Sequence, residues 1–146
     1  MNYGLIFMAR ADYTSARFCF ERAATLVPNY DVLEINRGIL EGAAGRKGDA
    51  ERHFQRAISL NSSAATAHFY FGRWLHQSGR EFEAAMQLSE AVAINPADLD
   101  ARHLLLDVWE RIGDRGKACA LARTTLGLVP ADPVASAVAG RRCAGG

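Results

Sequence analysis

The stretch AAMQLSEAVAINP, residues 84–96, decides the fold because similar stretches recur elsewhere in the chain. The same phrase stands earlier as ARFCFERAATLVP, at 16–28. It stands again later as ACALARTTLGLVP, at 118–130. A phrase that returns at a fixed interval indicates a fold built from stacked copies of one supersecondary unit.

The interval from Ala84 to Ala118 holds at five separate places in the phrase and around it. These places carry small residues or a terminal proline, and five registers with one period are very improbable by chance. The registers are Ala16, Ala50, Ala84 and Ala118; Ala23, Ala57, Ala91 and Thr125; Ala11, Gly45, Gly79 and Gly113; Gly4, Gly38, Gly72 and Leu106; and Pro28, Ser62, Pro96 and Pro130.

Each unit predicts two helices. The segment AHFYFGRWLHQSG, residues 67–79, has the i, i+3, i+4, i+7 apolar spacing of an amphipathic helix, and Gly79 is placed to end it. A second helix should run from about 81 to 94, because Asn95-Pro96 cannot continue it. Small residues at matching places predict close contact between the two helices.

The fold predicted from this pattern is all-α. One helix pair cannot bury its apolar face alone, whereas stacked pairs bury a continuous core. We therefore expect a right-handed α-solenoid of stacked antiparallel helix pairs, with a concave and a convex side.

Composition excludes some alternatives. The 146 residues carry a net charge of +1 and are 49% hydrophobic, so a general attraction to nucleic acid is not expected. No apolar run reaches the length of a membrane span, and the apolar start lacks a basic leader and a cleavage site. The default location is cytoplasmic, or extracytoplasmic if the chain is part of a larger protein. The three cysteines are expected to be free thiols.

The registers resemble the signature of the tetratricopeptide repeat family over about residues 1–132. That signature has a small residue and then an aromatic in the first helix, followed by Ala, an aromatic, Ala and a closing Pro in the second. The first unit matches it with Gly4, Phe7, Ala16, Phe20, Ala23 and Pro28, and the third with Gly72, Leu75, Ala84, Leu88, Ala91 and Pro96. The resemblance implies the superhelical stack of that family.

The expected organisation is a single domain over 1–140. Its repeats cover about 1–30, 31–64, 65–98 and 99–132, a short capping helix covers 133–139, and a flexible tail covers 141–146. The first helix of the first repeat is clipped at Met1. Either the chain begins with a shortened repeat or it is a piece of something longer.

The second repeat carries Arg37 and Glu41 where the family has apolar residues. They are four residues apart on one helix face and are able to pair. In one interpretation the helix rolls and Leu33, Leu40 and Ala44 fill the core while the long side chains reach water. In the other, the two residues form a partly buried ion pair.

No pattern in the chain predicts catalysis, a cofactor or a metal site. The four histidines lack any tight ligand spacing, and His68 and His76 are expected at the surface or in a groove. Glycines occur singly at helix junctions rather than in a phosphate-binding loop. We therefore expect a non-enzymatic chain without cofactors, without nucleic-acid binding and without direct membrane insertion.

The resemblance also implies a site, because first helices line the concave groove in this family. Asn36 matches the family's recurrent groove asparagine, which can hold a peptide backbone amide. The other positions of the subtype that grips a terminal carboxylate do not match, so that mode is not expected. The groove candidates are Ile35, Asn36, Ile39, Phe69, Tyr70, Arg73, His76, Gln77, His103, Asp107 and Arg111.

The function that follows is an interaction scaffold that binds a protein or peptide segment in the concave groove. Alternatively, the inner face packs against an upstream segment, the capping tail or a second copy of the chain, which would give a homodimer. A further alternative is a soluble repeat segment of a larger membrane-anchored protein, such as a repeat-bearing glycosyltransferase, or a secretion or pilus-assembly factor. Those last roles rest on fold analogy alone.

Overall fold

The computed structural model describes residues 2–143, and this part of the chain is helical with short turns and no strand. The first eight helices pair in chain order, each pair inside one repeat unit, and a ninth helix follows them within the described residues. They are α1 (Asn2–Ala9), α2 (Tyr13–Leu26), α3 (Asp31–Ala43), α4 (Lys47–Leu60), α5 (Ala65–Gln77), α6 (Glu81–Ile94), α7 (Leu99–Ile112), α8 (Arg115–Leu128) and α9 (Pro133–Arg142).

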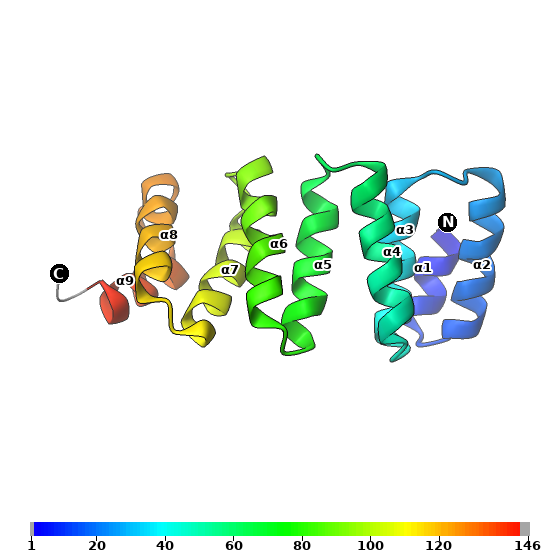
Figure 1. Ribbon diagram of the computed structural model, residues 1–146, viewed down its shortest axis with the longest axis horizontal. Coiled ribbons are helices and arrows are strands. Elements are labelled where there is room, and N and C mark those ends of the chain that lie inside the picture. Colours follow the sequence, from blue (N-terminus) through cyan, green and yellow to red (C-terminus); the bar gives the residue numbers. More distant parts are fainter. Residues whose placement is uncertain (1, 144–146) are drawn as a thin grey trace.

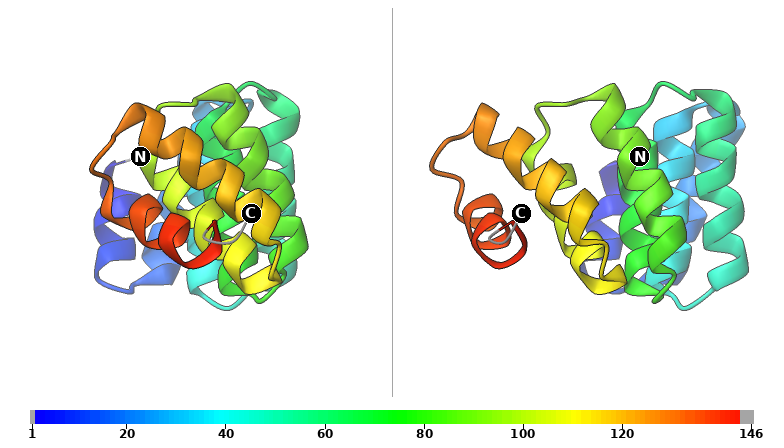
Figure 2. Two further views of the ribbon diagram at one scale, coloured as in Figure 1. Left: turned by 90° about the vertical axis from the view of Figure 1, so that its left-hand side faces the viewer. Right: turned by 60° about the vertical axis from the view of Figure 1, so that its left-hand side comes forward.

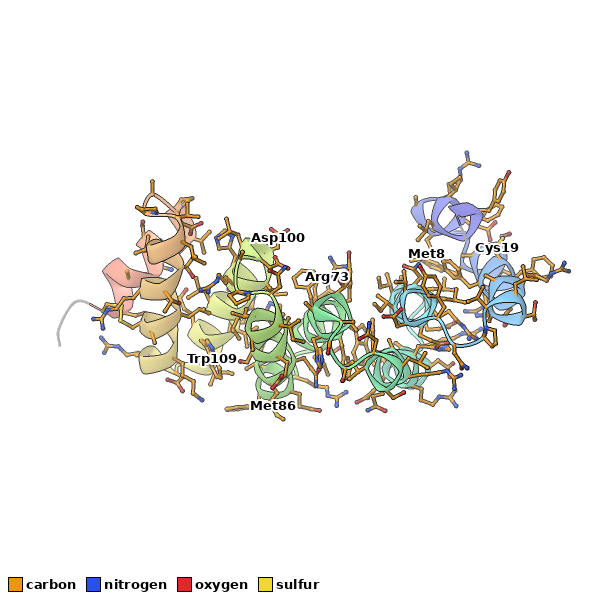
Figure 3. The ribbon with its side chains drawn as sticks, turned by 90° about the horizontal axis from the view of Figure 1, so that it is seen from above. Met8, Cys19, Arg73, Met86, Asp100 and Trp109 are labelled. Carbon is orange, nitrogen blue, oxygen red and sulfur yellow. A yellow bond between two sulfur atoms is a disulfide. The ribbon has the colours of Figure 1, made fainter. Side chains whose placement is uncertain are left out.

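The helices form two layers of a curved stack. In Figure 1, α4, α6 and α8 lie in front and α1, α3, α7 and α9 lie behind. Figure 2 shows the same stack turned, with α9 lying across the end formed by α7 and α8. Seen from above, the odd-numbered helices follow an arc whose inner side carries Met8, Arg73 and Asp100, whereas Met86 lies on the outer side (Figure 3). The predicted all-α solenoid is confirmed.

The turns within the repeats follow the sequence signals. The second helix of the third repeat spans Glu81–Ile94, as expected. Gly45, Gly79 and Gly113 each adopt a positive φ just past the first helix of their unit, at 77°, 77° and 84°. Ala11 holds the same register and has φ 57°, so the first repeat adopts with alanine a conformation that the others adopt with glycine.

The small residues of the first helices bring each pair into close contact. A Cβ atom on Gly38 would lie 2.8 Å from the ring of Phe54, and one on Gly72 would lie 2.7 Å from Leu88. The fourth repeat reverses the sizes, because Leu106 packs where glycine stands elsewhere and Ala122 takes the place of the large residue. Both side chains are fully buried. Interior volume is thereby kept while the residues exchange roles.

The core consists of apolar clusters along the stack, and the cluster formed by α1, α2 and α3 shares no residue with the rest. The centre of the core is aromatic: the rings of Phe54 and Phe71 stack at 5.5 Å between centroids, and those of Phe71 and Trp74 at 6.1 Å. Leu75 and Leu88 are fully buried beside them. Aromatic burial of this kind supplies much of the apolar contact between neighbouring repeats.

The C-terminal end differs from the expectation. Helix α9 continues to Arg142, three residues beyond the predicted end at 139. Cys143 then forms a disulfide with Cys119 of α8, so the expectation of three free thiols is wrong for these two residues. Cys19 remains free. Residues 141–143 of the predicted flexible tail are therefore held to the stack, and 144–146 lie outside the described residues.

Of the two interpretations of Arg37 and Glu41, the one that pairs them with each other is wrong. Arg17, from α2, donates from Nε and Nη2 to the Glu41 carboxylate at 2.7 and 2.9 Å. Arg37 instead pairs with Glu34 at 3.2 Å. Leu33 and Leu40 do fill the core, as the first interpretation required. The carboxylates of Glu34 and Glu41 are nevertheless buried, and their main partners come from neighbouring helices as well as from α3 itself.

Candidate partner-binding groove

The middle of the inner face holds a cluster of two aromatic rings and one guanidinium, all on α5. Phe69 and Tyr70 meet edge to face with centroids 5.3 Å apart. The Arg73 guanidinium carbon lies 4.7 Å from the Tyr70 ring centroid and 5.8 Å from that of Phe69. Tyr70 and Arg73 are one helical turn apart, which places them together on one face. The arrangement joins cation–π attraction to a large half-buried aromatic area.

Beside this cluster lies a hollow of about 320 Å³ between α3 and α5. The candidates Ile39, Tyr70, Arg73 and Gln77 all line it, together with Trp74 at its core side. Its other lining residues are Gly42, Ala43, Gly45, Lys47, Phe54 and Ser78. The hollow thus offers apolar contact, two cations and an amide within one small space.

The remaining candidates on α3 lie differently. Ile35 is only 3% exposed and packs in the core with Ala57 and Ala67, so it has no free groove surface. Asn36 is half-buried and makes a contact within the chain. A residue on the inner side of an amphipathic helix either faces the groove or packs against the next repeat. The periodicity of a single helix does not distinguish a groove residue from a residue packed between repeats.

His76 does not stand free in the groove. Its Nδ1 lies 2.7 Å from Glu81 of α6 and its Nε2 lies 3.0 Å from Asp107 of α7. Asp107 in turn accepts from Arg111 at 3.2 Å. Three predicted groove residues are therefore joined in a chain of polar contacts that ties the third repeat to the fourth.

The C-terminal part of the predicted groove meets the capping helix. His103 Nε2 lies 2.7 Å from Asp132, the N-cap residue of α9, and Glu110 accepts from Arg141 at 3.0 Å. His103 and Asp107 line a hollow of about 380 Å³ together with Val138 and other residues of α9. The capping tail thus contacts the surface of the fourth repeat, as one of the alternatives proposed.

Charged and polar contacts hold the capping helix α9 against the fourth repeat. The Ala135 backbone N–H donates to Asp132, and His103 adds a second contact, which together hold the pKa of Asp132 below its usual value. Arg141, followed by Arg142, lowers the pKa of Glu110 in the same way. Both carboxyl groups are therefore ionised at neutral pH and attract the start and the end of α9.

The position of His68 differs from the expectation. It is buried rather than at the surface or in a groove, with Nδ1 2.9 Å from the Gln87 side-chain oxygen and Nε2 3.2 Å from the Ser62 carbonyl. Two satisfied ring nitrogens in the interior give it a structural role. Within residues 2–143 no group of three or more His, Cys, Asp or Glu side chains is placed to hold a metal ion.

Two hollows on the outer face were missed by the sequence reasoning. One, of about 660 Å³, is ionic and lies between α2, α3 and α4; it is lined by Arg17, Glu21, Arg37, Glu41, Arg46, Asp49, Arg52, His53, Arg56 and Ser59. The other, of about 690 Å³, is mainly apolar and lies between α6, α7 and α8; it is lined by Ala85, Met86, Gln87, Ser89, Glu90, Val92, Ala93, Leu105, Trp109, Lys117, Ala120 and Leu121. The departure at Arg37 and Glu41 was the available signal for the first.

Solved structures of low sequence identity share this architecture. One is YrrB, described as a tetratricopeptide repeat protein with an unusual peptide-binding site. It is 23% identical in sequence, and the match covers 90% of this chain and 68% of that chain at a TM-score of 0.71. PilF of Pseudomonas aeruginosa has 17% identity, 96% of this chain, 66% of that one and a TM-score of 0.80. This chain has the tetratricopeptide repeat fold. No protein-family model and no curated protein matches its sequence.

The tetratricopeptide likeness covers most of the chain. The tetratricopeptide domain of Arabidopsis OM64 matches 76% of it with 19% identity, over 92% of that domain, at a TM-score of 0.63. Because these identities are below a quarter, they establish the fold and leave the groove chemistry to the residues themselves. Among the described residues, no helix is both long enough and apolar enough to cross a bilayer.

Proposed function

We propose that this tetratricopeptide chain is a non-enzymatic scaffold that binds an extended protein or peptide segment in its concave groove. The observation that carries the proposal is the cluster of Arg73 over Tyr70 and Phe69 at the edge of the inner hollow. Tyr and Arg are frequent interface anchors because each joins contact area to directed polar groups. The fold shared with YrrB, whose described feature is a peptide-binding site, supports the same class of function.

The proposed site is narrower than the sequence suggested. It centres on Ile39, Tyr70, Arg73 and Gln77, which share one hollow. Toward the C-terminus, the surface is engaged by α9 through Asp132 and its neighbours. A bound segment would therefore contact the second and third repeats and stop short of the cap.

Peptides selected from a displayed random library on the wild-type protein would test this proposal. Their affinity should fall roughly tenfold or more for Tyr70→Ala and for Arg73→Glu, as expected for central anchors. Phe82→Ala and Arg123→Glu are matched controls, since both residues are exposed on outer helices, and they should bind like the wild type. Selected peptides that bind both groove variants at full affinity would overturn the proposal.

A second copy of the chain is the competing occupant of this surface. Light scattering coupled to size-exclusion chromatography, over a range of protein concentrations, separates the two cases. A concentration-dependent dimer that Phe69→Asp converts to a monomer would mean that the groove binds itself. A monomer of unchanged mass in both proteins leaves the groove open to a different partner.

The disulfide bears on the compartment. A bond between Cys119 and Cys143 persists in an oxidising environment and is rare in a reducing one. We therefore favour an extracytoplasmic setting over the cytoplasmic default. Thiol labelling and mass measurement of protein from its native source should find one reactive cysteine, Cys19; three reactive cysteines would contradict this assignment.

A further inference from the structure

The ionic hollow on the outer face carries Arg37 and Glu41 at registers where the third and fourth repeats have apolar residues. Glu34 and Glu41, two turns apart on α3, are 2% and 5% exposed at its base. Removing a carboxylate from water is costly unless it is paired and hydrogen-bonded. Arg17 satisfies Glu41 with two hydrogen bonds, and His53 and Arg37 satisfy Glu34 at 2.7 and 3.2 Å.

Three further arginines lie at the rim of the hollow, outside the ion-paired Glu34 and Glu41. Arg46 reaches Glu41 only at 3.7 Å and Arg56 reaches Glu34 only at 3.6 Å, while Arg52 pairs with its helix neighbour Asp49. More than half of each of the three arginine side chains is exposed. Arg56 also donates to Asn29 at 3.4 Å. A guanidinium has five N–H donors, and these few contacts leave most of them unused. The base of the hollow does not depend on these three side chains.

The charge of the lining favours an anion. Five arginines and three carboxylates line the hollow, and adding Glu34 behind it still leaves one more arginine than carboxylate. The volume of about 660 Å³ exceeds the need of a single small ion and suits several side chains of an extended segment. Forked guanidinium donors match the two oxygens of a carboxylate.

We propose that the ionic hollow between α2, α3 and α4 is a second binding site, which takes an acidic segment of a partner protein. Arg46, Arg52 and Arg56 bind the carboxylates of that segment from the rim. Arg17 and Arg37 neutralise the two buried glutamates, and His53 contacts Glu34 at 2.7 Å, so that the hollow does not repel the ligand. This site lies on the outer face and does not rest on the proposed function of the inner groove.

An acidic protein segment suits the site better than a nucleic acid does. The net charge of the chain is +1, and the arginine excess is confined to one hollow. Nucleic-acid binding normally needs a basic stripe that follows the phosphate backbone over several contacts. A compact hollow with a few forked donors is matched by a short run of carboxylates.

The test uses the full chain and a fluorescein-labelled octaglutamate peptide, with octaglutamine as the uncharged control. Wild-type protein should bind octaglutamate, with affinity that falls as salt rises, and should not bind octaglutamine. The triple variant Arg46→Gln, Arg52→Gln, Arg56→Gln should bind roughly tenfold more weakly. A matched triple at exposed arginines outside the hollow, Arg22→Gln, Arg115→Gln, Arg123→Gln, should bind like the wild type.

Equal weakening by the two triples would show a general charge effect and overturn the site. Absence of octaglutamate binding by the wild type up to about 1 mM would overturn it as well. Competition by single-stranded oligothymidylate as strong as by octaglutamate would overturn the protein-segment assignment in favour of nucleic acid. Tyr70→Ala should bind octaglutamate normally, which separates this site from the inner groove. Shifts of the arginine Nε–H signals in the NMR spectrum, confined to Arg46, Arg52 and Arg56, are the supporting result.

Discussion

The two hollows of the outer face occupy equivalent places in different repeats, yet their chemistry is opposite. One lies between the first and second repeats and the other between the third and fourth. Their lining residues correspond at a separation of two repeat lengths. The corresponding pairs are Arg17 and Ala85, Arg37 and Leu105, Glu41 and Trp109, Asp49 and Lys117, and His53 and Leu121.

The difference teaches that the repeat fixes the place of a hollow, whereas individual substitutions fix what it does. In the apolar hollow, Leu105 and Trp109 remove hydrocarbon from water and so stabilise the stack. In the ionic hollow, the buried glutamates carry a desolvation cost that their ion pairs do little more than offset. Such an arrangement adds little to stability, which agrees with the binding role that we propose for the hollow.

The largest effect is expected from breaking the ionic base. Arg17→Ala removes both hydrogen bonds that satisfy Glu41 and leaves it with the distant Arg46. The free energy of unfolding should fall by about 3 kcal/mol, because a buried carboxylate is left under-paired. Urea denaturation followed by circular dichroism measures it.

Arg22→Ala on the same helix is the control for that measurement. Arg22 is exposed, so its loss should change the free energy of unfolding by less than about 0.5 kcal/mol. Similar values for the two variants would mean that Glu41 is solvated or repartnered, and that the ionic hollow differs less from an ordinary charged surface than its geometry implies.

An intermediate effect is expected when the ionic hollow is given the residues of its apolar counterpart. The double variant Arg17→Ala, Glu41→Trp introduces the residues found at 85 and 109 into the first two repeats and leaves the Arg37–Glu34 pair intact. It should recover about 2 kcal/mol of the stability lost in Arg17→Ala, because buried ion pairs are often replaced by packed hydrophobic groups without loss. The denaturation midpoint, at an unchanged slope against urea, is the measurement.

Failure of this recovery would be informative in the other direction. If the double variant remained as unstable as Arg17→Ala, the two hollows would differ in backbone shape as well as in side chains. The variant should also lose octaglutamate binding, since the base of the site would no longer hold its arginines in place.

Much of the architecture followed from periodicity. The register of Gly45, Gly79 and Gly113 predicted where first helices end, and α6 begins and ends as expected. Close packing at Gly38 and Gly72 also followed, because small residues at one register have a steric meaning. These are properties of local sequence, and a repeated unit states them several times.

Contacts between repeats were beyond the same reasoning. Helical spacing brought Arg37 and Glu41 together on one face, but the better-placed partner of Glu41 is Arg17, on the preceding helix. The disulfide of Cys119 was missed because α9 returns alongside α8 before Cys143, a path that no local signal encodes. Ile35 lies in the core because the neighbouring repeat covers it. In each case the sequence did not show which side chain of another helix would be the contact partner.

The smallest effect concerns the cation of the apolar hollow. The Lys117 ammonium lies 4.4 Å from the centroid of the Trp109 ring, and these two residues hold the registers of Asp49 and Glu41 in the ionic hollow. Lys117→Ala should lower the free energy of unfolding by about 0.5–1 kcal/mol, the usual range of an exposed cation–π contact with its packed stem. Tryptophan emission should change with it, because the charge leaves the indole face. Arg115→Ala, outside the contact, should alter neither quantity.

Salt dependence extends this last prediction to both hollows. High salt should weaken octaglutamate binding at the ionic hollow more than it reduces the Lys117→Ala difference. Salt screens the 3.6 Å ion pair of Lys117 with Asp114, whereas cation–π attraction at contact distance is screened less. Equal salt sensitivity in the two measurements would mean that Lys117 acts as a surface charge, and the two hollows would then share one electrostatic character.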